Sequence, residues 1–108
     1  MQNSGHFMLA LTTSTPKRLS SNFNAGDPNA SSPISWLSIQ AEAGNVAVVY
    51  VGFSPSVLSS SNYAHIIPIP VTSIPAAPLI IAAPITSLDQ VQVLGATDDA
   101  VTVGFIRS

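Results

Sequence analysis

The sequence predicts an all-β protein, an antiparallel β-sandwich of jelly-roll type with about eight short strands in a single domain spanning residues 1–108. Short apolar segments rich in β-branched and aromatic residues alternate with turns rich in Pro, Gly and Ser. No segment shows a helical period. A chain of 108 residues is long enough for one hydrophobic core but not for two.

The N-terminal third contains short elements. We expect His6–Leu11 to form the first strand and Lys17–Ser20 the second, because Pro16 and a Thr/Ser cluster separate them. An alternative for residues 1–15 is an N-terminal arm. The Asn22–Pro33 region has the Gly, Asp, Pro and Asn residues that are typical of a surface loop.

The central part predicts a β-hairpin. Two apolar segments, Trp36–Ala41 and Val46–Phe53, are separated by the short link Glu42–Asn45, whose Gly-Asn pair suits a tight turn. The second arm is apolar on both faces, so it is either central in the sandwich or covered by another subunit. Side-chain alternation in the first arm gives one buried face, made of Leu37, Ile39 and Ala41.

The middle of the chain is rich in proline. Residues Ser54–Asn62 are expected to form a loop and Tyr63–Pro70 an edge strand, because prolines at alternate positions cannot donate ladder hydrogen bonds. Residues 71–84 form a Pro-rich apolar loop. Two interpretations of this loop remain open: Leu79–Ala82 is another core strand, or Ser73–Pro78 is an arm that lies on a neighbouring chain.

The C-terminal part predicts a second hairpin. Its arms are Gln90–Gly95 and Ala100–Ile106, and its turn is Ala96–Asp99. The second arm alternates, and its core face consists of Val101, Val103 and Phe105.

Charged residues make up only 7% of the chain, against about 25% in an average soluble domain. The net charge of −2 predicts no attraction to nucleic acid or to an anionic membrane, and the prolines after Gly52 leave no room for a transmembrane helix. The apolar run Phe7–Leu11 lacks a basic leader, so we expect no signal peptide. An uncharged surface of this kind predicts self-association or a larger assembly.

Residues with catalytic or metal-binding chemistry are few. The chain has no cysteine, and neither His6 nor His65 has a second ligand at a metal-binding spacing. Asp98 and Asp99 are interpreted as turn residues, and Glu42 as the exposed tip of the central hairpin. No nucleophile elbow or phosphate-binding loop is present. The sequence therefore predicts a protein that is not an enzyme and holds no cofactor or metal ion.

The order of several segments resembles a known group of proteins. The chain contains LSIQA, the turn Gly44-Asn45, VVYVGFS, the serines 59–61, IPIP and LDQVQVLGATDDAVTVGFI, in that order. Over about residues 36–107 this order is similar to small β-sandwich virion structural proteins of tailed bacteriophages. The longer Pro-rich insertion Val71–Pro84 departs from the pattern of that group.

The resemblance implies a capsid cement or decoration protein at the surface of a virion, which stabilises the shell by binding the major capsid protein. We expect the chain also to bind itself, with a homotrimer favoured. The alternative is a component of the tail or head fibre that binds carbohydrate, with Tyr50, Tyr63 or Trp36 as stacking platforms. The residues predicted to lie at a subunit interface are Lys17, Arg18, Tyr63, Ile74, Pro75, Pro78 and Leu79.

Overall fold

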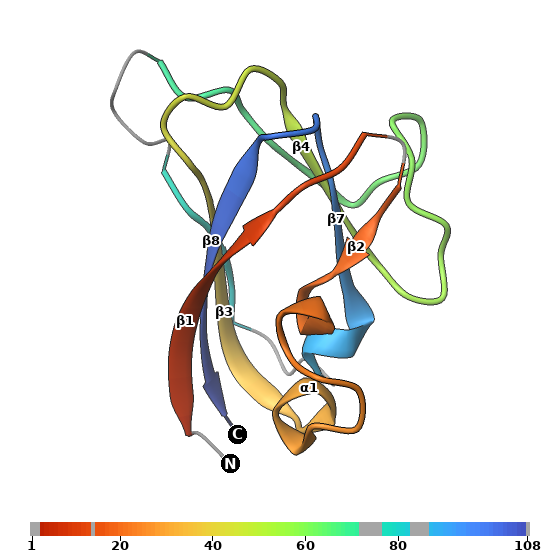
Figure 1. Ribbon diagram of the computed structural model, residues 1–108, viewed down its shortest axis with the longest axis vertical. Helices are drawn as coiled ribbons and strands as arrows, with labels where there is room; N and C mark the ends of the chain where they lie inside the picture. The colour runs from red at the N-terminus through yellow and green to blue at the C-terminus, as the bar shows by residue number, and fades with distance from the viewer. Residues whose placement is uncertain (1–2, 14, 72–76, 83–86, 108) are drawn as a thin grey trace.

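The structure, a computed structural model, describes residues 3–13, 15–71, 77–82 and 87–107. These residues form two four-stranded antiparallel sheets that pack as a sandwich (Figure 1). Sheet A has the strand order β1 (Ser4–Ala10), β8 (Ala100–Arg107), β3 (Ile34–Ala41) and β6 (Leu79–Ile81). Sheet B has the order β2 (Lys17–Arg18), β7 (Val91–Leu94), β4 (Val49–Phe53) and β5 (His65–Ile67). The predicted all-β sandwich is confirmed.

The strands pair in a nested order. β1 pairs with β8, β2 with β7, β3 with β6 and β4 with β5, and every one of these pairs is antiparallel. Two further ladders, β3 with β8 and β4 with β7, complete the sheets. This nesting is the jelly-roll arrangement, in which a long hairpin is folded over on itself.

Both predicted hairpins are wrong. β3 lies in sheet A and β4 in sheet B, so the Glu42–Asn45 link does not join two paired strands. Likewise β7 lies in sheet B and β8 in sheet A, so Ala96–Asp99 also crosses between the sheets. The reason is that each strand finds its partner far along the chain, whereas a jelly roll allows a local pair only between β4 and β5. The two links are therefore corners of the sandwich.

The core lies between the sheets and follows the predicted alternation. The predicted inward residues of β3 and β8 are buried, and so are Val49 and Val51 of β4. β4 lies between β7 and β5 and is thus interior to sheet B, but it begins at Val49, and Val46 of the predicted arm is 72% exposed. The buried residues predicted from β3 and β8 are Leu37, Ile39, Ala41, Val101, Val103 and Phe105.

One end of the sandwich is closed by three short helical turns, η1 (Leu19–Asn22), α1 (Pro28–Ser31) and η2 (Leu88–Gln90). Arg107, at the end of β8, donates from Nη1 to the carbonyl oxygen of Ser32 at 2.9 Å and from Nη2 to that of Asn29 at 2.5 Å. Its guanidinium lies 4.8 Å from the centre of the Phe105 ring. Burial lowers the pKa of Arg107, while the charge of Asp27 acts in the opposite direction.

The remaining strands lie at the edges. β5 is at the edge of sheet B, which confirms the edge strand predicted within Tyr63–Pro70, and β2 is shorter than the predicted Lys17–Ser20. β6, within the predicted Leu79–Ala82, is at the edge of sheet A with Leu79 and Ile81 packed against the core. Residues 72–76, which include most of the predicted Ser73–Pro78 arm, lie outside the described residues.

Candidate functional site

The outer side of sheet A presents one continuous set of side chains. They come from alternate residues of four strands, which the ladder registers place in neighbouring rows. Met8 is 65% exposed, and Ile80 and Ile106 are each 47% exposed. We call this surface the open face. Its residues are Ser4, His6, Met8, Ala10, Trp36, Ser38, Gln40, Ile80, Ala100, Thr102, Gly104 and Ile106.

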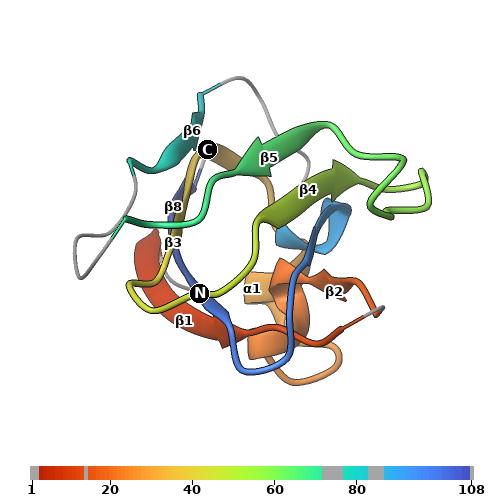
Figure 2. The same cartoon turned by 90° about the horizontal axis from the view of Figure 1, so that it is seen from above.

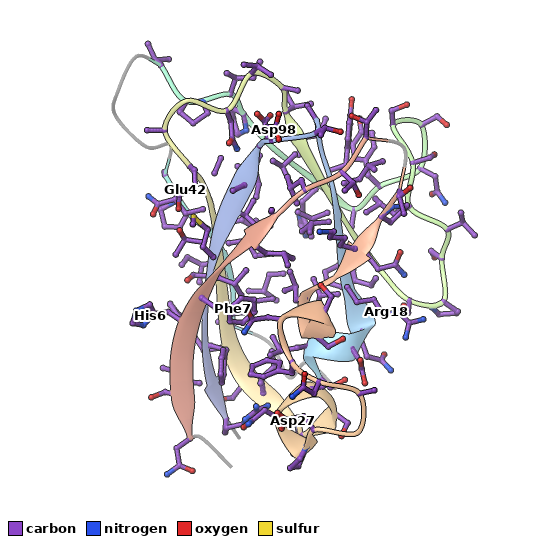
Figure 3. All side chains as sticks on the ribbon, in the orientation of Figure 1. His6, Phe7, Arg18, Asp27, Glu42 and Asp98 are labelled. Carbon is purple, nitrogen blue, oxygen red and sulfur yellow. The ribbon has the colours of Figure 1, made fainter. Side chains whose placement is uncertain are left out.

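The open face carries no Asp, Glu, Lys or Arg side chain. His6 is its one titratable group and points away from the sandwich, whereas Phe7 points into it (Figure 3). At the rim, the hydroxyl of Thr102 donates a hydrogen bond to Glu42. Glu42 is half-buried by this contact, so its prediction as an exposed hairpin tip is wrong. The face thus combines apolar and neutral polar groups.

Trp36 lies opposite Ile106 in the ladder between β3 and β8, and its indole ring extends toward Gly104, the next outward position of β8. A methyl group at Gly104 would lie 3.7 Å from Cζ3 of Trp36 and 2.9 Å from the hydroxyl oxygen of Ser38. The absence of a side chain at this position lets the indole lie close to the sheet. The result is a flat, half-exposed aromatic surface.

The outer side of sheet B is partly covered by its own chain. The loop between β4 and β5 returns over the sheet, and Leu58, only 4% exposed, packs above Gly52. The ring of Tyr63 lies 5.1 Å from that of Tyr50. The amide of Gln92 donates to the hydroxyl of Ser54 at 2.8 Å, which fixes the start of this loop.

A groove of about 490 Å³ lies between this loop and the β7–β8 corner. Tyr50 and Val48 line its sheet side, and Ser59 and Ser60 line one wall. Because no charged side chain lines the groove, it suits a neutral ligand that offers both apolar surface and hydroxyl groups. The remaining lining residues are Thr13, Ala47, Leu58, Leu94, Gly95 and Ala96.

A second hollow, of about 330 Å³, lies beside α1 and includes two carboxylates. Asp27 accepts from the backbone N–H of Asn29 at 2.9 Å and thereby caps α1. Asp89 accepts from the hydroxyl of Ser20 at 2.5 Å, which joins η2 to η1. Both carboxylates therefore have structural hydrogen bonds.

Two buried polar side chains tie the two corners together. The carboxylate of Asp99 accepts from the backbone N–H groups of Val46 and Ala47 at 3.0–3.1 Å. Asn45 in turn donates to the carbonyl oxygen of Ala100 at 2.9 Å and accepts from its N–H at 3.0 Å. Asp98 and Gly44 have φ angles of 74° and 95°, which make the tight bends. The turn assignment of the aspartates did not anticipate this cross-link.

The residues predicted for a subunit interface do not form one surface. Lys17 and Arg18 lie in β2, on the side of the sandwich where β1 and β2 are the edges. Pro78 and Leu79 lie on the opposite side, at β6 (Figure 2). Tyr63, just before β5, lies on that opposite side too and is 45% exposed. Pro78 is exposed, Leu79 is half-buried, and Ile74 and Pro75 lie outside the described residues.

Within the described part of the chain, no group of three or more His, Cys, Asp or Glu side chains is arranged to hold a metal ion. His65 instead packs edge-on against Phe53, with ring centres 6.1 Å apart. None of the described helices is long and apolar enough to cross a membrane. Comparison with protein families, curated proteins and solved structures found no match to this chain.

Proposed function

We propose that this chain is a non-enzymatic structural protein of a phage virion, a cement or decoration protein that binds the major capsid protein at the capsid surface. The open face is the observation that supports this role most directly. Interface centres are depleted in charged residues and enriched in aromatic residues and Met, and this face has Trp36 and Met8 with no charged side chain.

The size of the open face favours repeated, multi-copy binding. Strands of 7, 8, 8 and 3 residues, at about 3.3 Å per residue and about 4.8 Å between strands, give a projected area of about 400 Å². A specific interface buries about 800 Å² on each partner. One open face alone is therefore a weak binder. The proposed function therefore includes self-association, because copies of the chain that bind each other would bind a shell with gains from multivalency.

The fold and the segment resemblance agree with this proposal but are not specific to it. Jelly-roll sandwiches occur in viral capsid proteins, but the same fold also serves lectins and other functions. The resemblance to virion proteins of tailed phages covers structural positions only. The role therefore depends on what the open face binds.

Imaging of virions that contain the chain, combined with binding to isolated shells, tests the proposal. We expect density on the shell, and we expect Met8→Lys or Trp36→Ala to weaken shell binding at least tenfold. Val57→Lys is the matched control, because Val57 is 77% exposed on the β4–β5 loop of the other sheet. Density at the tail alone, or equal binding by all variants, would contradict the proposal.

A second candidate is carbohydrate binding by a tail or head-fibre component, and one observation favours it. Tyr50, which packs beside Tyr63, lines the uncharged groove together with Ser59 and Ser60. A glycan array with the wild-type chain and a Tyr50→Ala variant tests this candidate. Binding of a neutral glycan that the variant loses would support it, and no binding would remove it.

A further inference from the structure

β1 is the edge strand of sheet A, and two hydrogen bonds define which of its backbone groups point outward. Leu11 donates to Asp99 at 2.8 Å, and Asn3 accepts from Arg107 at 2.6 Å. In an antiparallel ladder, hydrogen-bonded pairs alternate with non-bonded pairs. The odd-numbered residues of β1 therefore bond to β8. The even-numbered residues direct both N–H and C=O away from the sheet.

The Lys17 contact agrees with this alternation and shortens the part of β1 whose outward backbone groups have no partner. Its ammonium group donates to the carbonyl oxygen of Ala10 at 2.9 Å, so that carbonyl points outward as the alternation requires. Ser4, His6 and Met8 remain, each with one outward N–H and one outward C=O. The structure shows no hydrogen bond to these groups from any of the residues it describes. In Figure 1, β1 forms the left flank of the sheet.

The other edge strands have features that prevent pairing with another chain. β6 and β5 are three residues long, and Pro78 and Pro68 adjoin them. β2 has only two residues, and both are basic. Short length, proline and positive charge are the devices by which sheet edges avoid association. β1, in contrast, has seven residues, no charge, no proline and an unbroken register with β8.

We propose that β1 pairs antiparallel with β1 of a second copy of this chain, so that the two sheets A become one continuous sheet. A two-fold axis at His6 puts Ser4 opposite Met8 of the partner subunit, and every outward group described above is then paired. This register also leaves the Lys17 contact intact. A second copy is favoured over an unrelated strand because the residues that meet across the axis include no Asp, Glu, Lys or Arg and present the same backbone pattern on both sides.

The pairing would also place two open faces side by side. Their combined projected area of about 800 Å² matches the roughly 800 Å² that a specific interface buries on one partner. The inference rests on the self-association in the proposed function, and not on the virion role. A two-fold contact gives an even number of copies, so it differs from the homotrimer expected from the sequence.

Sedimentation of variants tests the pairing. His6→Pro removes an outward N–H without touching the ladder to β8, and Met8→Lys adds a charge beside the edge. We expect the wild-type chain to form dimers and each variant to raise the dimer dissociation constant at least tenfold. Ile80→Lys, on the same face at the β6 edge, is the control and should leave it unchanged. If His6→Pro unfolds the chain, Met8→Lys still decides.

Amide hydrogen exchange gives an independent measurement on the unmodified protein. The amides of His6 and Met8 should become protected as concentration rises, whereas those of Phe7 and Leu9, which bond to β8, should be protected throughout. A wild-type chain that stays monomeric, or oligomers with unprotected His6 and Met8 amides, would overturn the inference. If a chain without this pairing still bound shells, the proposed function would stand and the pairing would be wrong. If the chain formed dimers with protected His6 and Met8 amides but did not bind shells, the pairing would stand and the proposed function would be wrong.

Discussion

The two outer faces of the sandwich differ in what completes them. Over sheet B the β4–β5 loop returns so that Leu58 covers Gly52 and Tyr63 packs beside Tyr50. Over sheet A, Met8, Ile80 and Ile106 stay 47–65% exposed. The chain therefore covers part of one face with its own loop, although Ile66 of β5 stays 43% exposed there, and leaves the other face uncovered. An uncovered face that carries several exposed apolar side chains is typical of an interaction site.

The difference also separates two kinds of residue. Substitutions on the covered face should change the stability of the isolated chain, because their partners belong to the same chain. Substitutions on the open face should change association and leave stability nearly unaltered.

Asp99→Ala should have the largest effect, because Asp99 holds the corner that both sheets share. The change removes a carboxylate that is 3% exposed and leaves the N–H groups of Val46 and Ala47 without it. We expect the free energy of unfolding to fall by about 3 kcal/mol in urea denaturation. Asp98→Gly is the matched control and should cost less than about 0.5 kcal/mol, since the φ angle of 74° suits glycine. Equal losses would contradict the role of Asp99.

Leu58→Ala compares the two faces directly. Leu58 is buried over sheet B, so the change should lower the free energy of unfolding by about 2.5 kcal/mol. Met8→Ala, on the open face, should change it by less than about 0.5 kcal/mol in the same denaturation experiment. If Met8→Ala cost as much as Leu58→Ala, the open face would be covered within one chain.

Gly52→Ala should lower the free energy of unfolding by about 1 kcal/mol, because the new methyl group would lie 3.0 Å from Cδ1 of Leu58. Thermal unfolding of the single and double variants measures this effect. In the Leu58→Ala background the same change should cost close to nothing, since the clashing atom is gone. An equal cost in both backgrounds would mean that backbone conformation, and not the loop contact, requires the glycine.

Tyr63→Leu should have the smallest effect and lower the free energy of unfolding by about 0.5 kcal/mol. The change removes only the ring contact with Tyr50 at a half-exposed site. A double-mutant cycle with Tyr50→Leu measures the coupling between the two rings. A coupling near zero would show that the rings lie together without stabilising the loop.

The fold class could be predicted from sequence because side-chain alternation is local. The core residues Leu37, Ile39, Val101 and Val103 follow from a period of two, and the prolines around β5 follow from the missing N–H donors. The two corners could not be predicted. A corner and a hairpin share the pattern of apolar strand, polar link and apolar strand. The partner strand that distinguishes them is distant in sequence, as β8 is for β3.

The candidate site was predictable only in part. Alternation placed Trp36 opposite the buried residues of β3, but its position among Gly104, Ile106 and Ile80 depends on two ladders between distant strands. The cross-link between Asn45 and the β7–β8 corner likewise joins residues far apart in sequence. Turn-forming residue types were visible at both corners, but the bonds between them were not.

The nested pairing has a consequence for how the chain folds. Only β4 and β5 are neighbours in both sequence and sheet, and each further pair encloses the previous one until β1 meets β8. Closing such long loops carries an entropy cost before the contacts reward it, so we expect folding in milliseconds to seconds, slower than in helical domains of this size. We expect the pairing to proceed outward from β4 and β5. The strand that would then join last, β1, is also the longest of the edge strands.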